Sequence, residues 1–332
     1  MRRRDNRAEA RGGPVWCAAA VLAVALGAAP ALGAPAGAAA LSSGTGPLGL
    51  HGGRPLAGRQ DARTSQSAPV SPAAPAEPAP RTPVPVDVTG AETIEYDAAT
   101  ASYVFIGAHV VVTRGDERLE APEIHYDGAN RRAVLPRHGM LSSPTMSMEA
   151  DAITADLGTR HVLAEGGVHG RFLDQGVWAT VTAARVEADD RPDLRRVDAS
   201  GDAVVVRGDQ ELRGSRIVYD RTAQHGTVEG RAIALRGGDR LEADHIEGNL
   251  ASRDGEATGH VVLDRPATHM HGTADRATYS GGADTVVLIG HAVVTRDRDR
   301  MEADQITVHL RDNSAVADGH PKIVAYPTGT SP

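Results

Sequence analysis

The stretch TRGDERLEAPEIHYD, residues Thr113–Asp127, is the unit from which most of the chain is built. It recurs with variation as VRGDQELRGSRIVYD, LRGGDRLEADHIEGN and TRDRDRMEADQITVH, which begin at Val206, Leu235 and Thr295. In all four copies an apolar Leu or Met follows the first arginine by five positions. Repetition at fixed spacing is typical of a repeat architecture, in which each unit buries its apolar face against its neighbours.

Glycines mark the repeat period between residues 87 and 326. Eight of them follow one another at intervals of 28 to 34 residues: Gly107, Gly139, Gly167, Gly201, Gly230, Gly259, Gly290 and Gly319. A second marker, a Leu-x-Ala-like pair, keeps the same period. Since two independent markers agree, the sequence predicts one long repeat domain over residues 87–326.

Each unit has the pattern of β-strands. A β-branched run such as Val110–Val112 follows the glycine, and a Gly-Asp turn then leads to an alternating segment such as Leu119–Tyr126. The parity of the apolar positions changes between Ala121 and Ile124, and it changes at the same place in other copies, which predicts a bulge or corner. A third short strand, such as Thr227–Glu229, is expected to lead to the next glycine. The valine runs are apolar on both parities, so the sequence leaves open which of their faces points inwards.

The two ends of the chain differ from the repeat region. Residues 1–33 combine five arginines, a 15-residue apolar run and small residues at positions 31–33, the pattern of a cleaved export signal. An uncleaved N-terminal anchor is the alternative. Residues 34–86 hold ten of the twenty prolines and predict a disordered linker, because such a segment has little apolar surface to bury. Residues 327–332 are expected to form a tail.

Charge and cysteine content narrow the classes of function. The chain has a net charge of −8, and residues 1–33 contribute five arginines against two acids, so the remainder is near −11. An acidic surface argues against a nucleic-acid partner. The single cysteine, Cys17, lies in the apolar run of the predicted export signal. After cleavage of this signal the mature chain would contain no thiol, which suits an oxidising compartment.

The repeat motif resembles a known family. Segments Gly107–Asp127 and Gly201–Asp220 share a glycine, a valine run, a Gly-Asp turn and the motif L-x-[AG]-x-x-I-x-Y-D. This pattern resembles the LptA/OstA-like family of periplasmic lipopolysaccharide-transport bridge proteins and organic-solvent-tolerance N-terminal-like domains, over residues 87–326. The resemblance implies an all-β fold: an open, V-shaped antiparallel β-jelly-roll whose apolar trough holds lipid acyl chains. It also implies a periplasmic location and edge-strand stacking with an inner-membrane export complex, an outer-membrane assembly protein or further copies of the chain.

The candidate trough residues are the inward apolar positions of the four copies. They are Leu119, Ile124, Tyr126, Leu212, Ile217, Tyr219, Leu241, Ile246, Met301, Ile306 and Val308. An aromatic content of only 3% fits a trough that is not filled by large rings. Ordinary core packing is the alternative interpretation for each of them. No cofactor is expected.

Other motifs carry less weight. The Arg-Gly-Asp tripeptides at Arg114 and Arg207 occupy the turn position of the repeat, so we interpret them as hairpin turns rather than adhesion motifs. His269 and His271 could share one face of a strand, but no third ligand stands at a metal-binding spacing. No catalytic motif is present, so the protein is not expected to be an enzyme.

The predicted function is therefore lipid-binding transport of lipopolysaccharide between the inner and outer membranes. The alternative is an exported structural or adhesive β-solenoid without lipid binding, in which neighbouring strands would be parallel.

Overall fold

The computed structural model describes residues 84–174, 176–191 and 194–326, and these form a β-unit of twenty strands. The predicted export signal (1–33), residues 34–83 of the predicted linker and the predicted tail (327–332) lie outside the described residues. Among the described residues no helix has the length and apolarity needed to cross a membrane.

The elements are β1 (Asp87–Thr89), β2 (Thr93–Asp97), β3 (Ser102–Arg114), β4 (Glu117–Asp127), β5 (Arg132–Leu135), β6 (Gly139–Ser143), β7 (Met146–Ala150), β8 (Ala152–Asp156), β9 (His161–Asp174), β10 (Val177–Arg191), β11 (Leu194–Arg207), β12 (Gln210–Asp220), β13 (His225–Arg236), β14 (Asp239–Asn249), β15 (Asp254–Arg265), the 3-10 helix η1 (Pro266–Thr268), β16 (Met270–Ser280), β17 (Thr285–Arg296), β18 (Asp299–His309), β19 (Ser314–Asp318) and β20 (Lys322–Val324).

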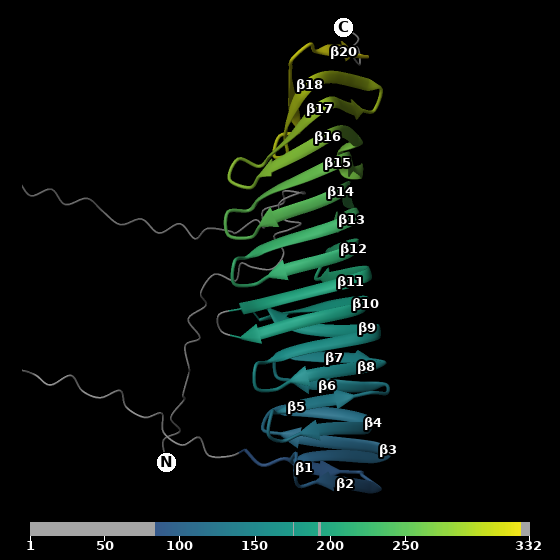
Figure 1. Ribbon diagram of the computed structural model, residues 1–332. Helices are drawn as coiled ribbons and strands as arrows, with labels where there is room; N and C mark the ends of the chain where they lie inside the picture. The colour runs from purple at the N-terminus through teal and green to yellow at the C-terminus, as the bar shows by residue number, and fades with distance from the viewer. Residues whose placement is uncertain (1–83, 175, 192–193, 327–332) are drawn as a thin grey trace, which may run out of the picture. The chain divides into compact units, whose positions relative to one another are not determined.

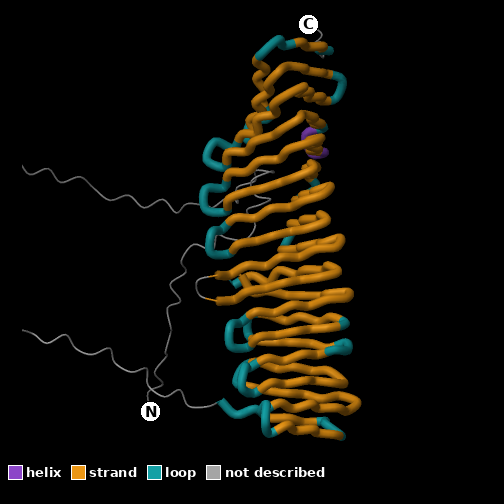
Figure 2. Tube along the Cα trace, in the orientation of Figure 1, coloured by secondary structure: helices purple, strands orange, loops and turns teal. Residues whose placement is uncertain are grey.

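The strands pair in the order of the chain. From β9 to β18 each long strand is hydrogen-bonded to the one before it and the one after it, always antiparallel. Two short strands replace one long strand at β1/β2, β5/β6, β7/β8 and β19/β20. Figures 1 and 2 show the resulting stack, which runs from β2 at the bottom to β20 at the top.

Every long strand bends at a corner, where the pairing register shifts. The corner divides the stack into two walls. Wall A holds the segments that include 168–174, 177–183, 203–207 and 210–213, and wall B holds those that include 161–165, 185–191, 194–200 and 216–220. The side opposite the corner, where the strands end in turns, is called the mouth. The corner predicted from the parity change is confirmed by these register shifts.

Left-handed backbone makes the corner possible. Gly259 has φ +76° and His260 has φ +48°, and a Cβ at Gly259 would lie 2.2 Å from Asp244 Oδ2 on the preceding strand. Glycine is therefore required here for both its backbone freedom and its small size. His260 Nδ1 lies 2.8 Å from the same Asp244 oxygen. The arrangement recurs at the next two corners, as His291 with Asp275 and His320 with Asp304.

These corners correct one expectation from the sequence. The predicted third strand Thr227–Glu229 is the first half of β13, which continues through Gly230 into the apolar segment Ile233–Leu235. From β13 onwards, a repeat therefore consists of two bent strands rather than three straight ones. The predicted all-β antiparallel jelly-roll is confirmed, and the strand pairs of the described residues are all antiparallel, unlike those of a parallel solenoid.

The core lies between the two walls and runs through the stack as one apolar cluster. Val110 and Val112 belong to this cluster and Val205 packs against it, which decides the inward face of the valine runs. Val206, by contrast, is exposed on the outer face.

Candidate functional site

The eleven residues predicted to line a trough all belong to the interior of the stack. Eight of them are buried: Leu119, Ile124, Tyr126, Ile217, Leu241, Ile246, Ile306 and Val308. Leu212, Tyr219 and Met301 are partly buried and pack against the same cluster. In each copy the Leu or Met before the parity change, such as Leu212, lies on wall A. The apolar positions after the parity change, such as Ile217 and Tyr219, lie on wall B. The two halves of the motif therefore face each other across the interior.

An apolar cavity of about 90 Å³ lies between the walls, at strands β9 to β13. It is bordered by three of the predicted residues, Leu212, Ile217 and Tyr219. Ala199 lines this space with a small side chain. The walls therefore leave an apolar space between them in the middle of the stack.

The interior is better filled on either side of that cavity. At β3 and β4, Leu119 and Ile124 pack in the same cluster as Phe105, and each is at most 3% exposed. Near Leu241 and Ile246 the remaining space is about 20 Å³. Burial raises the pKa of Tyr126 and of Tyr279, since their hydroxyl groups lie close to the apolar interior.

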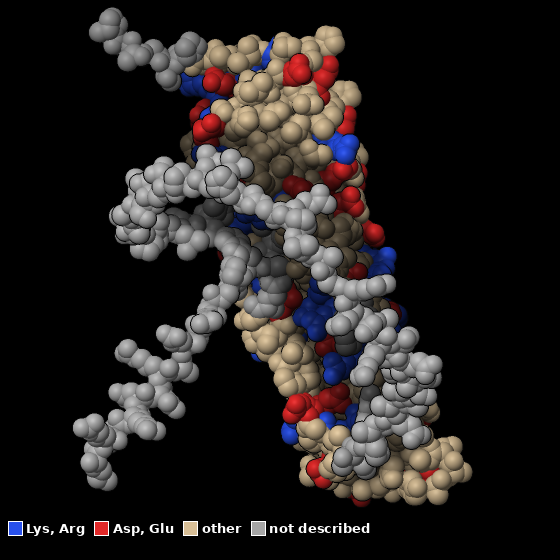
Figure 3. Space-filling model, turned by 90° about the vertical axis from the view of Figure 1, so that its left-hand side faces the viewer, with Lys and Arg blue, Asp and Glu red and all other residues tan. Residues whose placement is uncertain are grey.

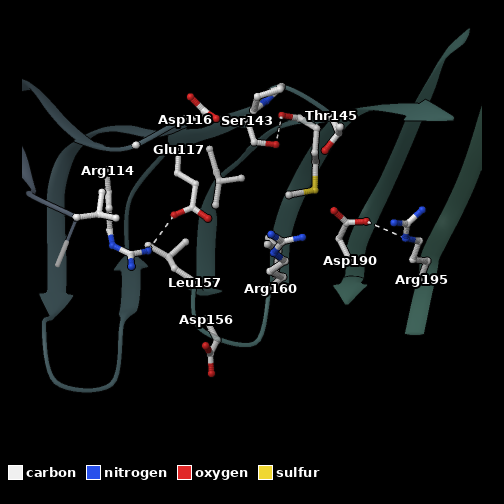
Figure 4. Close-up of a pocket in the computed structure, with 16 residues that line it drawn as sticks. Arg114, Asp116, Glu117, Ser143, Thr145, Asp156, Leu157, Arg160, Asp190 and Arg195 are labelled. Carbon is white, nitrogen blue, oxygen red and sulfur yellow. Dashed lines mark hydrogen bonds and ion pairs between the residues drawn. The ribbon is translucent and has the colours of Figure 1, made fainter. Parts of the chain in front are cut away.

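A larger, more polar cavity of about 510 Å³ lies at the mouth beside strands β3 to β11 (Figure 4). Leu141, Met146, Leu157 and Val162 supply its apolar lining. Its charged lining comes from three arginines and four acids: Arg114, Arg160, Arg195, Asp116, Glu117, Asp156 and Asp190. Two ion pairs join these groups, Arg114 with Glu117 at 3.3 Å and Arg195 with Asp190 at 3.9 Å.

Polar side chains cross the mouth at two places. Near the middle of the stack Arg221, at the end of wall B, pairs with Asp174, at the end of wall A; the distance from Nε to Oδ1 is 3.2 Å. Near the C-terminal end Arg265 donates to the side-chain oxygen of Asn313 at 3.2 Å, and Arg296 donates to its carbonyl oxygen at 3.0 Å. Among the described strands no pairing joins the walls at these points, so the contacts across the mouth there come from these side chains.

Sequence reasoning missed the residues that cross the mouth. The sequence does contain a pattern at this position. The strands of wall A that run towards the mouth mostly end in arginine, as β3, β11, β13, β15 and β17 do. Strand β9 ends in Asp174 instead. This charge reversal at one repeat position could have singled out Asp174, but its partner Arg221 lies 47 residues further along the chain.

The outer surface carries many charged pairs. On the face shown in Figure 3, Lys and Arg side chains lie interspersed with Asp and Glu side chains. In one well-formed pair Arg216 donates from Nε and Nη2 to the two carboxylate oxygens of Asp198, at 2.8 and 2.6 Å. The Arg216 guanidinium lowers the pKa of Asp198. Exposed pairs of this kind each contribute little to stability.

The minor motifs have ordinary structural roles. Gly115 and Gly208 of the Arg-Gly-Asp tripeptides lie in hairpin turns with φ near +60°, as predicted. His269 Nδ1 lies 2.8 Å from Asp297, and His271 Nδ1 lies 2.6 Å from Asp264. The part of the chain that the structure describes contains no group of three or more His, Cys, Asp or Glu residues arranged to hold a metal ion.

Part of the chain matches the model of a known protein family. Residues 180–314 match the family described as LptA/(LptD N-terminal domain) LPS transport protein. Among solved structures, the chain is similar to LptH, the LptA homologous periplasmic component of the conserved lipopolysaccharide transport device from Pseudomonas aeruginosa. That similarity has 18% identity and a TM-score of 0.24, and it covers 45% of this chain and 95% of LptH. No curated protein matches the chain significantly in sequence.

Proposed function

We propose that this protein is a periplasmic lipid carrier, because residues 180–314 match the family described as LptA/(LptD N-terminal domain) LPS transport protein. It moves lipopolysaccharide from the inner to the outer membrane and holds the acyl chains of lipid A between walls A and B. The eleven trough residues are the ones that contact these chains.

The observation that carries this proposal is the apolar cavity, most of whose lining residues fall in the matched segment. Leu212, Ile217 and Tyr219 border it, and all three lie within residues 180–314. An acyl chain placed there gains about 0.8 kcal/mol for each methylene group removed from water. The cavity of about 90 Å³ is far below the ~300–1,000 Å³ of typical ligand pockets, so uptake of a whole chain requires the walls to separate.

The two ends of the stack support the proposed partners. Within residues 84–326, as far as the structure describes them, strands β1 and β2 pair only with β3, and β19 and β20 pair only with β18, so both ends present strand edges to further partners. Apolar side chains are exposed at both ends, with Ile94 58% exposed on β2 and Ile323 62% exposed on β20. We propose that these edges stack on the inner-membrane export complex, on the outer-membrane assembly protein or on a second copy of the chain.

Site-specific crosslinking in cells tests the proposal. A photoreactive amino acid is placed at Ile217 or Ile246, which face the interior, and at Ser215, which is exposed on the outer side of the corner. We expect lipopolysaccharide adducts at the two interior positions and none at Ser215. Equal yields at all three positions, or no adduct at Ile217 and Ile246, would refute lipid transport in the interior.

A further inference from the structure

Asp174 is the one carboxylate among the residues that border the apolar cavity. It is 7% exposed and stands where the equivalent strand ends of wall A carry arginine. Burial of a charged group is costly unless it is fully paired, so a buried acid at a position of repeated arginines calls for a specific explanation.

The contacts of Asp174 are incomplete. Its Oδ1 accepts a hydrogen bond from Arg221 Nε at 3.2 Å, and its backbone carbonyl accepts one from Arg207 Nη2 at 3.5 Å. Its Oδ2 is buried and has no hydrogen-bond partner among the described residues. Leaving a buried oxygen without a partner is unfavourable, so a group that satisfies this site better can displace the Asp174 carboxylate.

Arg221 separates two cavities. Together with Asp174 and Arg207 it borders the apolar cavity. Its Nη1 also donates to Asp190 Oδ1 at 3.4 Å, and Asp190 lines the mouth cavity of about 510 Å³ with Arg195. The Asp174–Arg221 pair therefore lies between the mouth cavity and the apolar cavity, where a molecule passing from one to the other would meet it.

The charges at this point favour an anion. Three guanidinium groups lie at this point: Arg221 pairs with the carboxylates of Asp174 and Asp190, Arg195 pairs with Asp190, and Arg207 donates to the backbone carbonyl of Asp174. If Asp174 moves aside, Arg221 loses one of its two carboxylate partners and can accept another anion in its place. A phosphate monoester, which carries about −1.5 to −2 at neutral pH, is such an anion.

We propose that Asp174, Arg207 and Arg221 form a gated head-group site for a phosphate-bearing amphiphile. The phosphate takes the place of the Asp174 carboxylate on Arg221, with Arg207 beside it, and the acyl chain enters the cavity beside Leu212 and Tyr219. Arginine binds phosphate through parallel N–H donors, and such charge-assisted bonds are about twice as strong as neutral ones. The inference rests on the proposed function in one respect, namely that the interior accepts acyl chains.

The test is a binding titration of the purified full-length chain with three probes below their micelle concentrations. The probes are monododecyl phosphate, neutral dodecyl maltoside and inorganic phosphate, each measured by calorimetry against the wild type and single variants. We expect Arg221→Gln to weaken binding of dodecyl phosphate about tenfold or more and to leave binding of dodecyl maltoside unchanged. Asp174→Asn removes the competing charge and is expected to strengthen binding of dodecyl phosphate about tenfold.

The matched control is Arg311→Gln. Arg311 also lies at a strand end of wall B, but it pairs with Asp284 at 2.8 Å and is 80% exposed, away from the cavity. This variant is expected to bind all three probes as the wild type does. Arg207→Gln serves as a second variant if Arg221→Gln does not fold, as judged by circular dichroism.

The outcomes separate this inference from the proposed function. If both amphiphiles bind and neither Asp174→Asn nor Arg221→Gln changes their affinity ratio, the gated site is wrong while the lipid-binding interior stands. If inorganic phosphate binds as tightly as dodecyl phosphate, the proposed site is also wrong, because the acyl chain would then contribute nothing to the affinity. If neither amphiphile binds, the lipid-binding interior itself is refuted.

Discussion

Gly214→Ala is the substitution for which the repeat pattern and the structure give opposite expectations. Gly214 stands where other copies carry Ala121, Ala243 and Ala303. By the pattern alone, alanine belongs at this position and stabilises the strand by roughly 0.5–1 kcal/mol, because glycine loses more backbone entropy on folding. A consensus argument therefore predicts a more stable protein.

The surroundings of Gly214 predict the reverse. A Cβ at this position would lie 2.6 Å from Val228 Cγ1 and 2.8 Å from the carbonyl oxygen of Glu229. That oxygen cannot retreat freely, because it accepts a hydrogen bond from the Ser215 hydroxyl at 2.9 Å. Overpacking of this kind costs about 1–3 kcal/mol. Set against the gain in backbone entropy, the net loss is about 1–2 kcal/mol, or roughly 3–6 °C in the melting temperature.

Urea unfolding followed by circular dichroism, with hydrogen exchange of the β12 and β13 amides, measures this loss. Because each strand contacts only its neighbours, the faster exchange is expected to concentrate in these two strands. Gly282→Ala is the control, since a Cβ at Gly282 has no atom within 4 Å. A Gly214→Ala protein as stable as the wild type, or more stable, would show that the corner has room and that the packing argument is mistaken.

Two further predictions concern the core and the corner. The side chain of Ile306 has no exposed surface, so Ile306→Ala is expected to lower the free energy of unfolding by about 2–5 kcal/mol in a urea titration. Val316 is 58% exposed, so Val316→Ala is expected to change this free energy by less than about 0.5 kcal/mol. Equal effects of the two substitutions would contradict the assigned core. Asp275 raises the pKa of His291 by accepting its hydrogen bond. The charged histidine therefore stabilises the fold fully at pH values below its unfolded-state pKa. This stabilisation is lost as the pH rises through the raised pKa of the folded state. An NMR titration is expected to show the His291 midpoint falling in Asp275→Asn, and an unchanged midpoint would mean that the pair does not form in solution.

The sequence alone determined the repeat, the β-strand character of its units and the inward positions of the Leu-x-Ala and following alternating segments, but neither the inward face of the valine runs nor the number of strands in a unit. The spacing of glycines and of Leu-x-Ala pairs follows from the need of each strand to bury one face against its neighbours, so the period is visible in one dimension. The parity change between Ala121 and Ile124 located the corner for the same reason, since a residue on the wrong parity would point into water. The repeat pattern could not show that the chain rounds Gly230 without leaving the strand, because that continuity depends on backbone dihedral angles.

Only the tertiary structure decided how the two walls meet. Asp174 and Arg221 lie in different walls and 47 residues apart, and no periodic pattern relates them. The cavity they border lies between walls that are joined at the corner and spanned by side chains at the mouth, and Ala199 lines it with a small side chain. Strand pairing is local and repeats along the chain, whereas the distance between the walls is set by the volume of all the side chains between them.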